Sequence, residues 1–115
     1  MATEIGHRVA DLADSLDSQD KPAFANELRK SSFRVSGILA EGSSCPTKPE
    51  FAEFVAHARA ATLEIANLVI FFSERELISE DEEANLVNML KRESKMLENF
   101  RQSLERAPRP EPIVA

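Results

Sequence analysis

The chain has 115 residues, of which 43% are apolar and 30% are charged, and its formal net charge is −6. This size and balance predict one folded, soluble domain and exclude a mostly disordered chain. The negative charge argues against a general nucleic-acid binder, because such proteins gather Lys and Arg against phosphates, but it permits a local basic face. With three glycines and neither Tyr nor Trp, the composition favours helices over strands.

Signals for targeting are absent from the sequence. The N-terminus lacks the basic and apolar regions of a signal peptide, and the longest apolar run, residues 68–72, is far shorter than the ~20 residues that cross a bilayer. A single cysteine, Cys45, lies in a segment rich in Gly, Ser and Pro and fits a reducing compartment. We therefore expect a cytoplasmic protein without a membrane segment.

The first predicted helix covers residues 3–16. Thr3 can act as its N-cap by accepting a hydrogen bond from an otherwise unpaired backbone N–H. Residues 17–20 then have the composition of a turn. Apolar residues recur at intervals of four, three and four, which places one face of this helix toward a core: Ile5, Val9, Leu12 and Leu16.

The second predicted helix covers residues 22–41. Pro22 suits its first position, where the missing N–H would have no partner, and Gly42 is predicted as its C-terminal stop. We expect Gly37 to leave space for a neighbouring helix. The segment 42–49, with Gly, two Ser and two Pro, is predicted as the connection to the third helix. The expected inner face consists of Phe24, Leu28, Val35 and either Ile38 or Leu39.

The third predicted helix covers residues 49–75 and is apolar on more than one side. One stripe repeats at intervals of three and four residues, and a second set widens it: Val55, Leu63, Val69, Ile70 and Phe71. A helix that is apolar on several sides must be covered on several sides. We therefore predict self-association through this helix, with Leu63, Ile70 and Phe71 as possible interface residues.

The fourth predicted helix covers residues 79–105. Ser79 and Glu82 have the spacing of a capping box, in which each side chain satisfies a backbone donor near the other. The core-facing positions include Leu86, Leu90, Leu97, Phe100 and Leu104. The segment 106–115 carries three prolines and is predicted to be a flexible tail.

Short connections between four helices predict one all-α domain over residues 1–105. The expected architecture is an antiparallel up-down-up-down four-helix bundle with left-handed crossing.

Two acidic residues are candidates for a buried polar layer in this bundle. Glu93 falls between Leu90 and Leu97, where an apolar residue is expected, and Glu64 lies on the third helix. Their side chains could form a polar site inside the bundle. The alternative is that each reaches solvent or pairs with a base and so fixes the register of the helices.

Two sets of basic residues could contact phosphates if they repeat around an oligomer. Arg29, Lys30 and Arg34 lie on the second helix. Lys91, Arg92 and Lys95 lie on the fourth. The alternative is that they are solvated or pair with acids one turn away, since Glu27 is close to Lys30 and Glu98 to Lys95 and Arg101.

Metal-binding and catalytic motifs are incomplete. Di-metal bundles use two Glu-x-x-His motifs, whereas this chain has only Glu4 with His7, together with Glu53 and His57 at a spacing of four. It has no Gly-x-Ser-x-Gly turn and no glycine-rich phosphate loop. We therefore expect no metal, no cofactor, no catalytic residues and no small-molecule substrate.

Several segments resemble a bacterial family of four-helix-bundle proteins encoded by intervening sequences in large-subunit ribosomal RNA. The resemblance covers residues 24–105 and rests on the order and spacing of five segments. They are Leu28-Arg29-Lys30, Leu39-Ala40-Glu41-Gly42, Pro49-Glu50-Phe51-x-x-Phe54, Thr62-Leu63-Glu64-Ile65 and residues 76–82. A related branch of the family includes the accessory protein of diversity-generating retroelements.

The resemblance implies a cytoplasmic homo-oligomer, typically a ring of five, without catalytic activity. It also implies nucleic-acid association in the retroelement branch, where the ring is strongly basic. This chain departs from the family in its negative charge, in its lack of a tryptophan in the first helix, and in the segment 35–39, which lacks the family's proline and asparagine.

These observations predict a non-enzymatic, self-associating scaffold or interaction module. The alternative is an RNA-binding accessory protein that acts through basic patches repeated around a ring. An enzyme or a metal-binding bundle ranks third.

Overall fold

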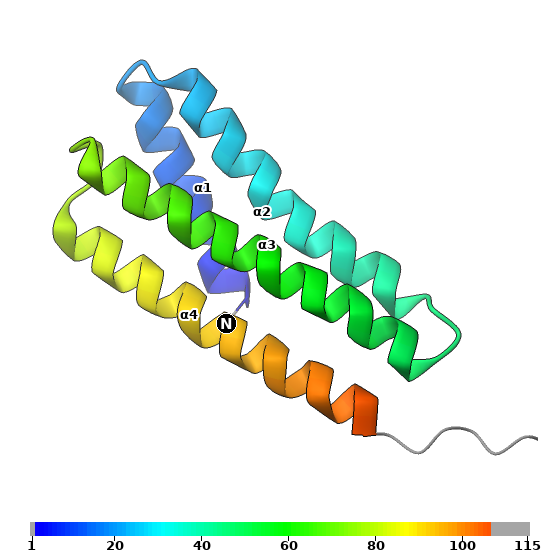
Figure 1. Cartoon of the computed structure of the whole chain (residues 1–115). Coiled ribbons are helices and arrows are strands. Elements are labelled where there is room, and N and C mark those ends of the chain that lie inside the picture. The colour runs from blue at the N-terminus through cyan, green and yellow to red at the C-terminus, as the bar shows by residue number, and fades with distance from the viewer. Residues whose placement is uncertain (1, 107–115) are drawn as a thin grey trace, which may run out of the picture.

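The computed structural model describes residues 2–106, with side chains from residue 4 onward. It contains four helices and, within that range, no strand (Figure 1). The helices are α1 (Ala2–Ser18), α2 (Pro22–Ser43), α3 (Lys48–Glu74) and α4 (Glu80–Arg106). The prediction of an all-α protein with four helices is confirmed. Of the tail predicted over residues 106–115, Arg106 belongs to α4, and residues 107–115 lie outside the described residues.

Local sequence features define the starts of three helices. Pro22 is the first residue of α2, as predicted. Thr47 caps α3, its Oγ1 accepting a hydrogen bond from the N–H of Glu50 at 3.3 Å. Ser79 caps α4 by accepting from the N–H of Glu82 at 3.1 Å, which is one half of the predicted capping box. The prediction for Thr3 is wrong, because α1 already begins at Ala2.

Left-handed residues close the ends of α1 and α3. Asp20 and Glu76 have φ of 61° and 60°. Beside them, the N–H of Lys21 reaches the carbonyl of Leu16 and the N–H of Leu77 reaches that of Phe72, each at 2.9 Å. This pattern satisfies the last helical carbonyls and reverses the chain direction within a few residues.

Each helix folds back along the one before it, and α3 has a central position, with α2 and α4 on either side (Figure 1). α1 packs mainly on α2 and touches α4 less. The left-handed sense of the crossing stays a prediction.

The core has two apolar clusters. In the first cluster, all four helices contribute buried side chains, and α1 supplies the ones that its periodicity predicted. The buried members of this cluster include Val9, Leu16, Leu28, Val69, Phe72 and Leu90. Val35 of α2 packs against this cluster and against the second one.

The second cluster contains no residue of α1. Its buried members are Ala52, Val55 and Ala58 of α3 with Leu97 and Leu104 of α4, and α2 adds partly buried residues. The reason is length, since α1 has 17 residues whereas α3 and α4 have 27 each. At 1.5 Å per residue, α1 is ~15 Å shorter than its neighbours. One end of the bundle is therefore a three-helix end.

Neither glycine of α2 has the role that the sequence suggested. Gly42 lies inside α2, is buried and has no positive φ, so it is not the predicted stop. A Cβ placed there would lie 2.5 Å from Cβ of Phe54, so Gly42 provides the close approach of α2 to α3. Gly37, predicted to do this, is exposed, and a Cβ there would meet nothing within 4 Å.

α3 is long and apolar enough, by length and composition, to cross a membrane. Its most apolar 18-residue window has a mean hydropathy of 1.3, and 39% of that window is buried in the bundle. The central helix of a soluble protein meets the same criterion, because it must be covered on several sides.

Candidate interaction surfaces

The predicted interface residues of α3 make contacts within the chain that partly bury them. Leu63 is half-buried, and Ile70 packs against the first core cluster. Phe71 is 40% exposed. Its ring makes an edge contact with Phe24 at 5.6 Å and lies under the guanidinium of Arg75. Because α2 and α4 flank α3, the broad apolar surface seen in the sequence is largely covered within one chain.

Exposed apolar side chains occur instead on α4, beyond the start of α1. Met96 is 49% exposed and Phe100 is 41% exposed, and the ring of Phe100 packs edge-on against Phe51 with centroids 5.4 Å apart. Met96 and Phe100 are one turn apart on the same side of α4. We name Phe51, Met96 and Phe100 the open face, because Phe51 packs against the second core cluster, which contains no residue of α1, and Phe100 packs on Phe51.

The continuity of α4 explains why the open face is uncovered. The α4 residues that line clefts against α1 include Leu86 and Met89. Met96 and Phe100 continue this stripe at +7 and +11 from Met89, which returns to the same side of a helix. Glu4, near the start of α1, lines a cleft with Met89 and Arg92, so Met96 and Phe100 lie further along α4 than the start of α1. The fourth helix of the first cluster therefore does not reach them.

Phe33 forms a second exposed apolar site, on α2. Its side chain is 76% exposed, the largest value among the big apolar residues described. It lies next to Arg34 and three residues after Lys30. No local pattern in the sequence distinguishes Phe33 from the phenylalanines of the core.

The basic residues of α2 are largely neutralised inside the chain. The guanidinium of Arg29 donates hydrogen bonds to the carboxylates of Asp17 at 2.7 Å and Asp14 at 2.9 Å. These hydrogen bonds, of which the one to Asp17 has the larger effect, raise the pKa of Arg29. Arg34 bonds both carboxylate oxygens of Glu64 at 3.1 and 3.2 Å. A phosphate would have to displace these carboxylates, so Arg29 and Arg34 are poorly placed for nucleic acid.

The basic residues of α4 are arranged differently. Lys91, Arg92 and Lys95 are exposed, and no ion pair joins them to an acid among the described residues. Lys30 of α2 is also exposed without such a pair. Glu98, one predicted partner of Lys95, bonds Arg101 instead, which lowers the pKa of Glu98 to about 2. Three cations thus share one side of α4.

The predicted polar layer contains Glu93 but not Glu64. Glu64 is exposed and pairs with Arg34 across α2 and α3, so the hypothesis of burial is wrong for this residue, and the register role fits it. Glu93 is half-buried, and its Oε2 is fully buried without a hydrogen-bond partner. The buried hydroxyl of Thr62, which the sequence predicts to lie level with Glu93, donates to the carbonyl of Ala58 at 2.8 Å.

Replacing Glu93 with leucine is expected to stabilise the fold by about 1–2 kcal/mol, because a buried carboxylate oxygen without a partner is replaced by an apolar group in a leucine seam. Urea unfolding followed by circular dichroism measures the change. Glu53→Leu on the exposed side of α3 is the matched control and should shift stability by less than about 0.5 kcal/mol. A loss of stability in Glu93→Leu would show that the carboxylate is compensated.

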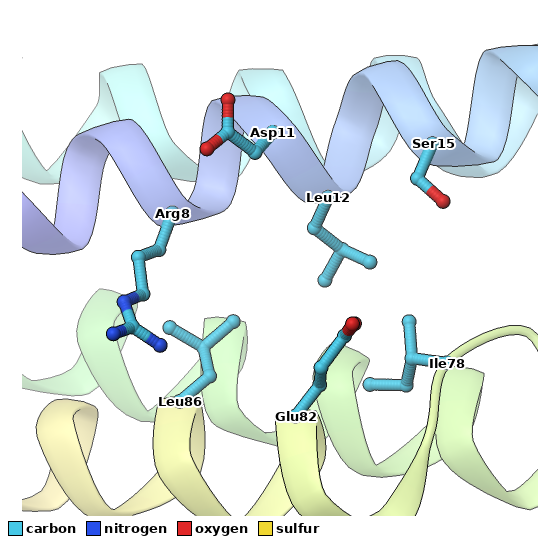
Figure 2. A pocket seen from close by; sticks show the side chains of 7 residues that line it. All are labelled: Arg8, Asp11, Leu12, Ser15, Ile78, Glu82 and Leu86. Carbon is cyan, nitrogen blue, oxygen red and sulfur yellow. The ribbon is translucent and has the colours of Figure 1, made fainter.

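Two clefts lie between α1 and α4, where these helices pack least. The first has a volume of about 320 Å³ and is drawn in Figure 2, in which Leu12 points toward Glu82 and Ile78 on the opposite wall. The second, of about 440 Å³, shares Arg8 with the first. Their walls mix apolar side chains, such as Leu12 and Met89, with charged ones, such as Arg8 and Glu82.

The predicted metal candidates do not converge. Glu4, His7, Glu53 and His57 are all exposed. Across the part of the chain that the structure describes, no three His, Cys, Asp or Glu side chains lie together in a way that could hold a metal ion.

Comparison with protein families identifies the chain. A family model described as "23S rRNA-intervening sequence protein" matches residues 1–99, which include α1 to α3 and most of α4. Searches of curated proteins and of solved structures found no match. The match extends over most of the chain and confirms the resemblance seen in residues 24–105. The chain therefore belongs to the family of 23S rRNA-intervening sequence proteins.

Proposed function

We propose that this protein is a non-enzymatic, self-associating bundle that serves as an oligomeric scaffold or interaction module in the cytoplasm. The unit is an up-down-up-down, left-handed four-helix bundle. The observation that carries the proposal is the three-helix end, where Met96 and Phe100 of α4 stay exposed and Phe100 packs on Phe51 at the edge of the second core cluster. Large apolar side chains exposed beside a core commonly mark a surface that another molecule covers.

The positions of the exposed side chains favour a head-to-tail contact. Phe33 lies on α2, whereas the open face belongs to α3 and α4, so the two sites are separate surfaces of one chain. When Phe33 of one copy packs on the open face of the next, the contact is heterologous, and repeating it closes a ring if the rotation allows. Five copies is the number that the family resemblance suggests. Leu63, Ile70 and Phe71 are candidates for additional contacts.

Replacing Phe100 with glutamate is expected to abolish association at micromolar concentration, because a charge would be buried in the contact. Asn99→Glu is the matched control, since it adds the same charge to the neighbouring exposed position of α4. Light scattering and sedimentation equilibrium measure the mass of each variant, and circular dichroism verifies its helices. A wild-type chain that stays monomeric at all concentrations would overturn the proposal.

A mixing experiment tests the head-to-tail arrangement. Phe33→Glu should also give monomers, with Ser36→Glu as its control. In a heterologous contact, the Phe33→Glu chain keeps an intact open face and the Phe100→Glu chain keeps an intact Phe33. Mixing the two monomers should therefore produce a 1:1 dimer. If the mixture stays monomeric while the wild type associates, the contact is of another kind.

RNA binding is the second candidate function. It is supported by Lys91, Arg92 and Lys95, which share one side of α4 and form no ion pair with an acid among the described residues. Repetition around a ring would multiply these charges, although the net charge of −6 per chain opposes polyanions.

Titration with structured RNA at two salt concentrations tests this second candidate. Replacing the three residues with alanine should remove binding and its salt dependence. Replacing Arg29 and Arg34 should have a smaller effect, since acids already hold them. The absence of binding by the wild type at low salt would exclude this function.

A further inference from the structure

We propose that Lys30 of one copy pairs with Glu93 of the next copy, and that this ion pair fixes the direction and register of the head-to-tail contact. The inference rests on the proposed function, in which Phe33 packs on the open face. It adds a charged pair at the edge of that apolar contact and so identifies what the open face selects in its partner.

Glu93 is a carboxylate that lacks a partner among the described residues of its own chain. The residue is half-buried, its Oε2 is fully buried without a hydrogen bond, and no ion pair joins it to a base in that part of the chain. A carboxylate in this state costs free energy, because no donor replaces the water that the buried oxygen has lost. Since the residue is not enclosed, a cation from outside the chain can approach it.

Glu93 also borders the open face. Met96 follows it by three residues and Phe100 by seven, and these separations return to the same side of a helix. A molecule that covers Met96 and Phe100 therefore passes beside the carboxylate. It must bring a positive charge to Glu93 or leave the carboxylate with still less water.

Lys30 supplies such a charge beside Phe33. Its side chain is exposed and forms no ion pair with an acid among the described residues. It lies three residues before Phe33, which places both on the same side of α2. The neighbouring bases Arg29 and Arg34 already bind carboxylates of their own chain. Of these three bases, Lys30 is therefore the one available to another copy.

The two surfaces have matching spacings. Lys30 and Phe33 are three residues apart, as are Glu93 and Met96, and three residues span ~4.5 Å along a helix axis. When α2 of one copy lies along α4 of the next in the same direction, Phe33 meets Met96 and Phe100. In this arrangement Lys30 lies one turn away, at the position of Glu93. The apolar contact and the ion pair can therefore form together.

The opposite direction offers Lys30 no such partner. It would carry the ammonium group toward the end of α4, where Glu98 and Glu105 already bind Arg101. Complementary charges select partner and register in this way, because a misplaced charge is left without a counter-ion. The pair thus distinguishes one direction of the contact from the other.

A dimer with a single contact tests the pair. The Phe100→Glu chain supplies Phe33 and Lys30, and the Phe33→Glu chain supplies the open face and Glu93, so their 1:1 dimer contains the contact once. Lys30→Met in the first chain and Glu93→Gln in the second each remove one charge. Either change alone should weaken the dimer ~10-fold or more, and the two together should weaken it little further. Sedimentation equilibrium measures the dissociation constants.

Exchanging the charges gives a second readout. Lys30→Glu or Glu93→Lys alone should weaken the dimer more than the neutral variants do, because like charges then meet. The two together should return the dissociation constant to within ~10-fold of that of the starting dimer. Lys21→Met and Glu53→Gln, both at exposed positions, are the matched controls and should leave dimerisation unchanged. Circular dichroism verifies the helices, and the neutral variants decide if a reversed charge disturbs the fold.

The outcomes separate the ion pair from the apolar contact. If the dimer forms but the two neutral substitutions act independently or have no effect, the ion pair is overturned and the proposed function stands. If the two chains keep their helices but their mixture stays monomeric, the ion pair is overturned together with the head-to-tail contact on which it rests.

Discussion

Replacing Phe72 with alanine is expected to destabilise the protein by about 3–5 kcal/mol, because it empties a fully enclosed site in the first core cluster. The side chain is the largest of the fully buried ones. Its ring lies 5.6 Å from that of Phe24 and 5.9 Å from that of Phe71, so the substitution also removes two ring contacts. A loss of this size is comparable with the whole stability of many small domains.

Urea unfolding followed by circular dichroism measures the effect, and the neighbouring Phe71 provides the control. Phe71 is 40% exposed and sits at the rim of the same aromatic group. Phe71→Ala should therefore cost about 1–2 kcal/mol, since less apolar surface returns to water. Equal losses for the two variants would mean that the packing at Phe72 relaxes to fill the space.

The helices were predictable because each carries a local signal. The four-three spacing of Val9, Leu12 and Leu16 places all three in the core. Pro22 and Ser79 start their helices through backbone chemistry that depends on neighbours only a few residues away. The turns were harder to specify, because Asp20 and Glu76 occupy left-handed positions where glycine would be the usual sign.

The surfaces were less predictable because exposure depends on which helix lies opposite. Phe100 continues the leucine seam of α4, and only the shortness of α1 leaves it exposed. The sequence contains a signal for this exposure, because the first predicted helix has 14 residues and the fourth has 27, so the first is too short to cover the whole length of the fourth. The exposure of Phe33 had no such signal.

The partners in ion pairs were also hard to predict from the sequence. Sequence spacing suggested partners one turn away, whereas Arg29 bonds two acids of α1 and Arg34 bonds Glu64 of α3. These pairs cross between helices and depend on their relative register, which a single sequence does not supply. The three basic residues of α4 are exposed and form no ion pair with an acid among the described residues, although Arg92 lines a cleft that also includes Glu4 of α1.

Replacing Gly42 with alanine is expected to destabilise the fold by about 1–3 kcal/mol, although alanine is the better helix former. The added Cβ would lie 2.5 Å from Cβ of Phe54 and 2.8 Å from Cδ1 of Phe51. The clash with Phe54 involves an atom fixed to the backbone of α3, so a rotamer change cannot relieve it. α2 and α3 must separate at this end, and urea unfolding measures the cost.

Gly37→Ala in the same helix is the matched control and should change stability in the opposite direction. A Cβ at Gly37 meets nothing within 4 Å, so the substitution should stabilise α2 by about 0.5–1 kcal/mol through helix propensity alone. Opposite signs for two identical substitutions would locate the close approach of α2 and α3 at residue 42. Because Phe51 also packs against Phe100, the Gly42 variant should weaken self-association as well, whereas the Gly37 variant should leave it unchanged.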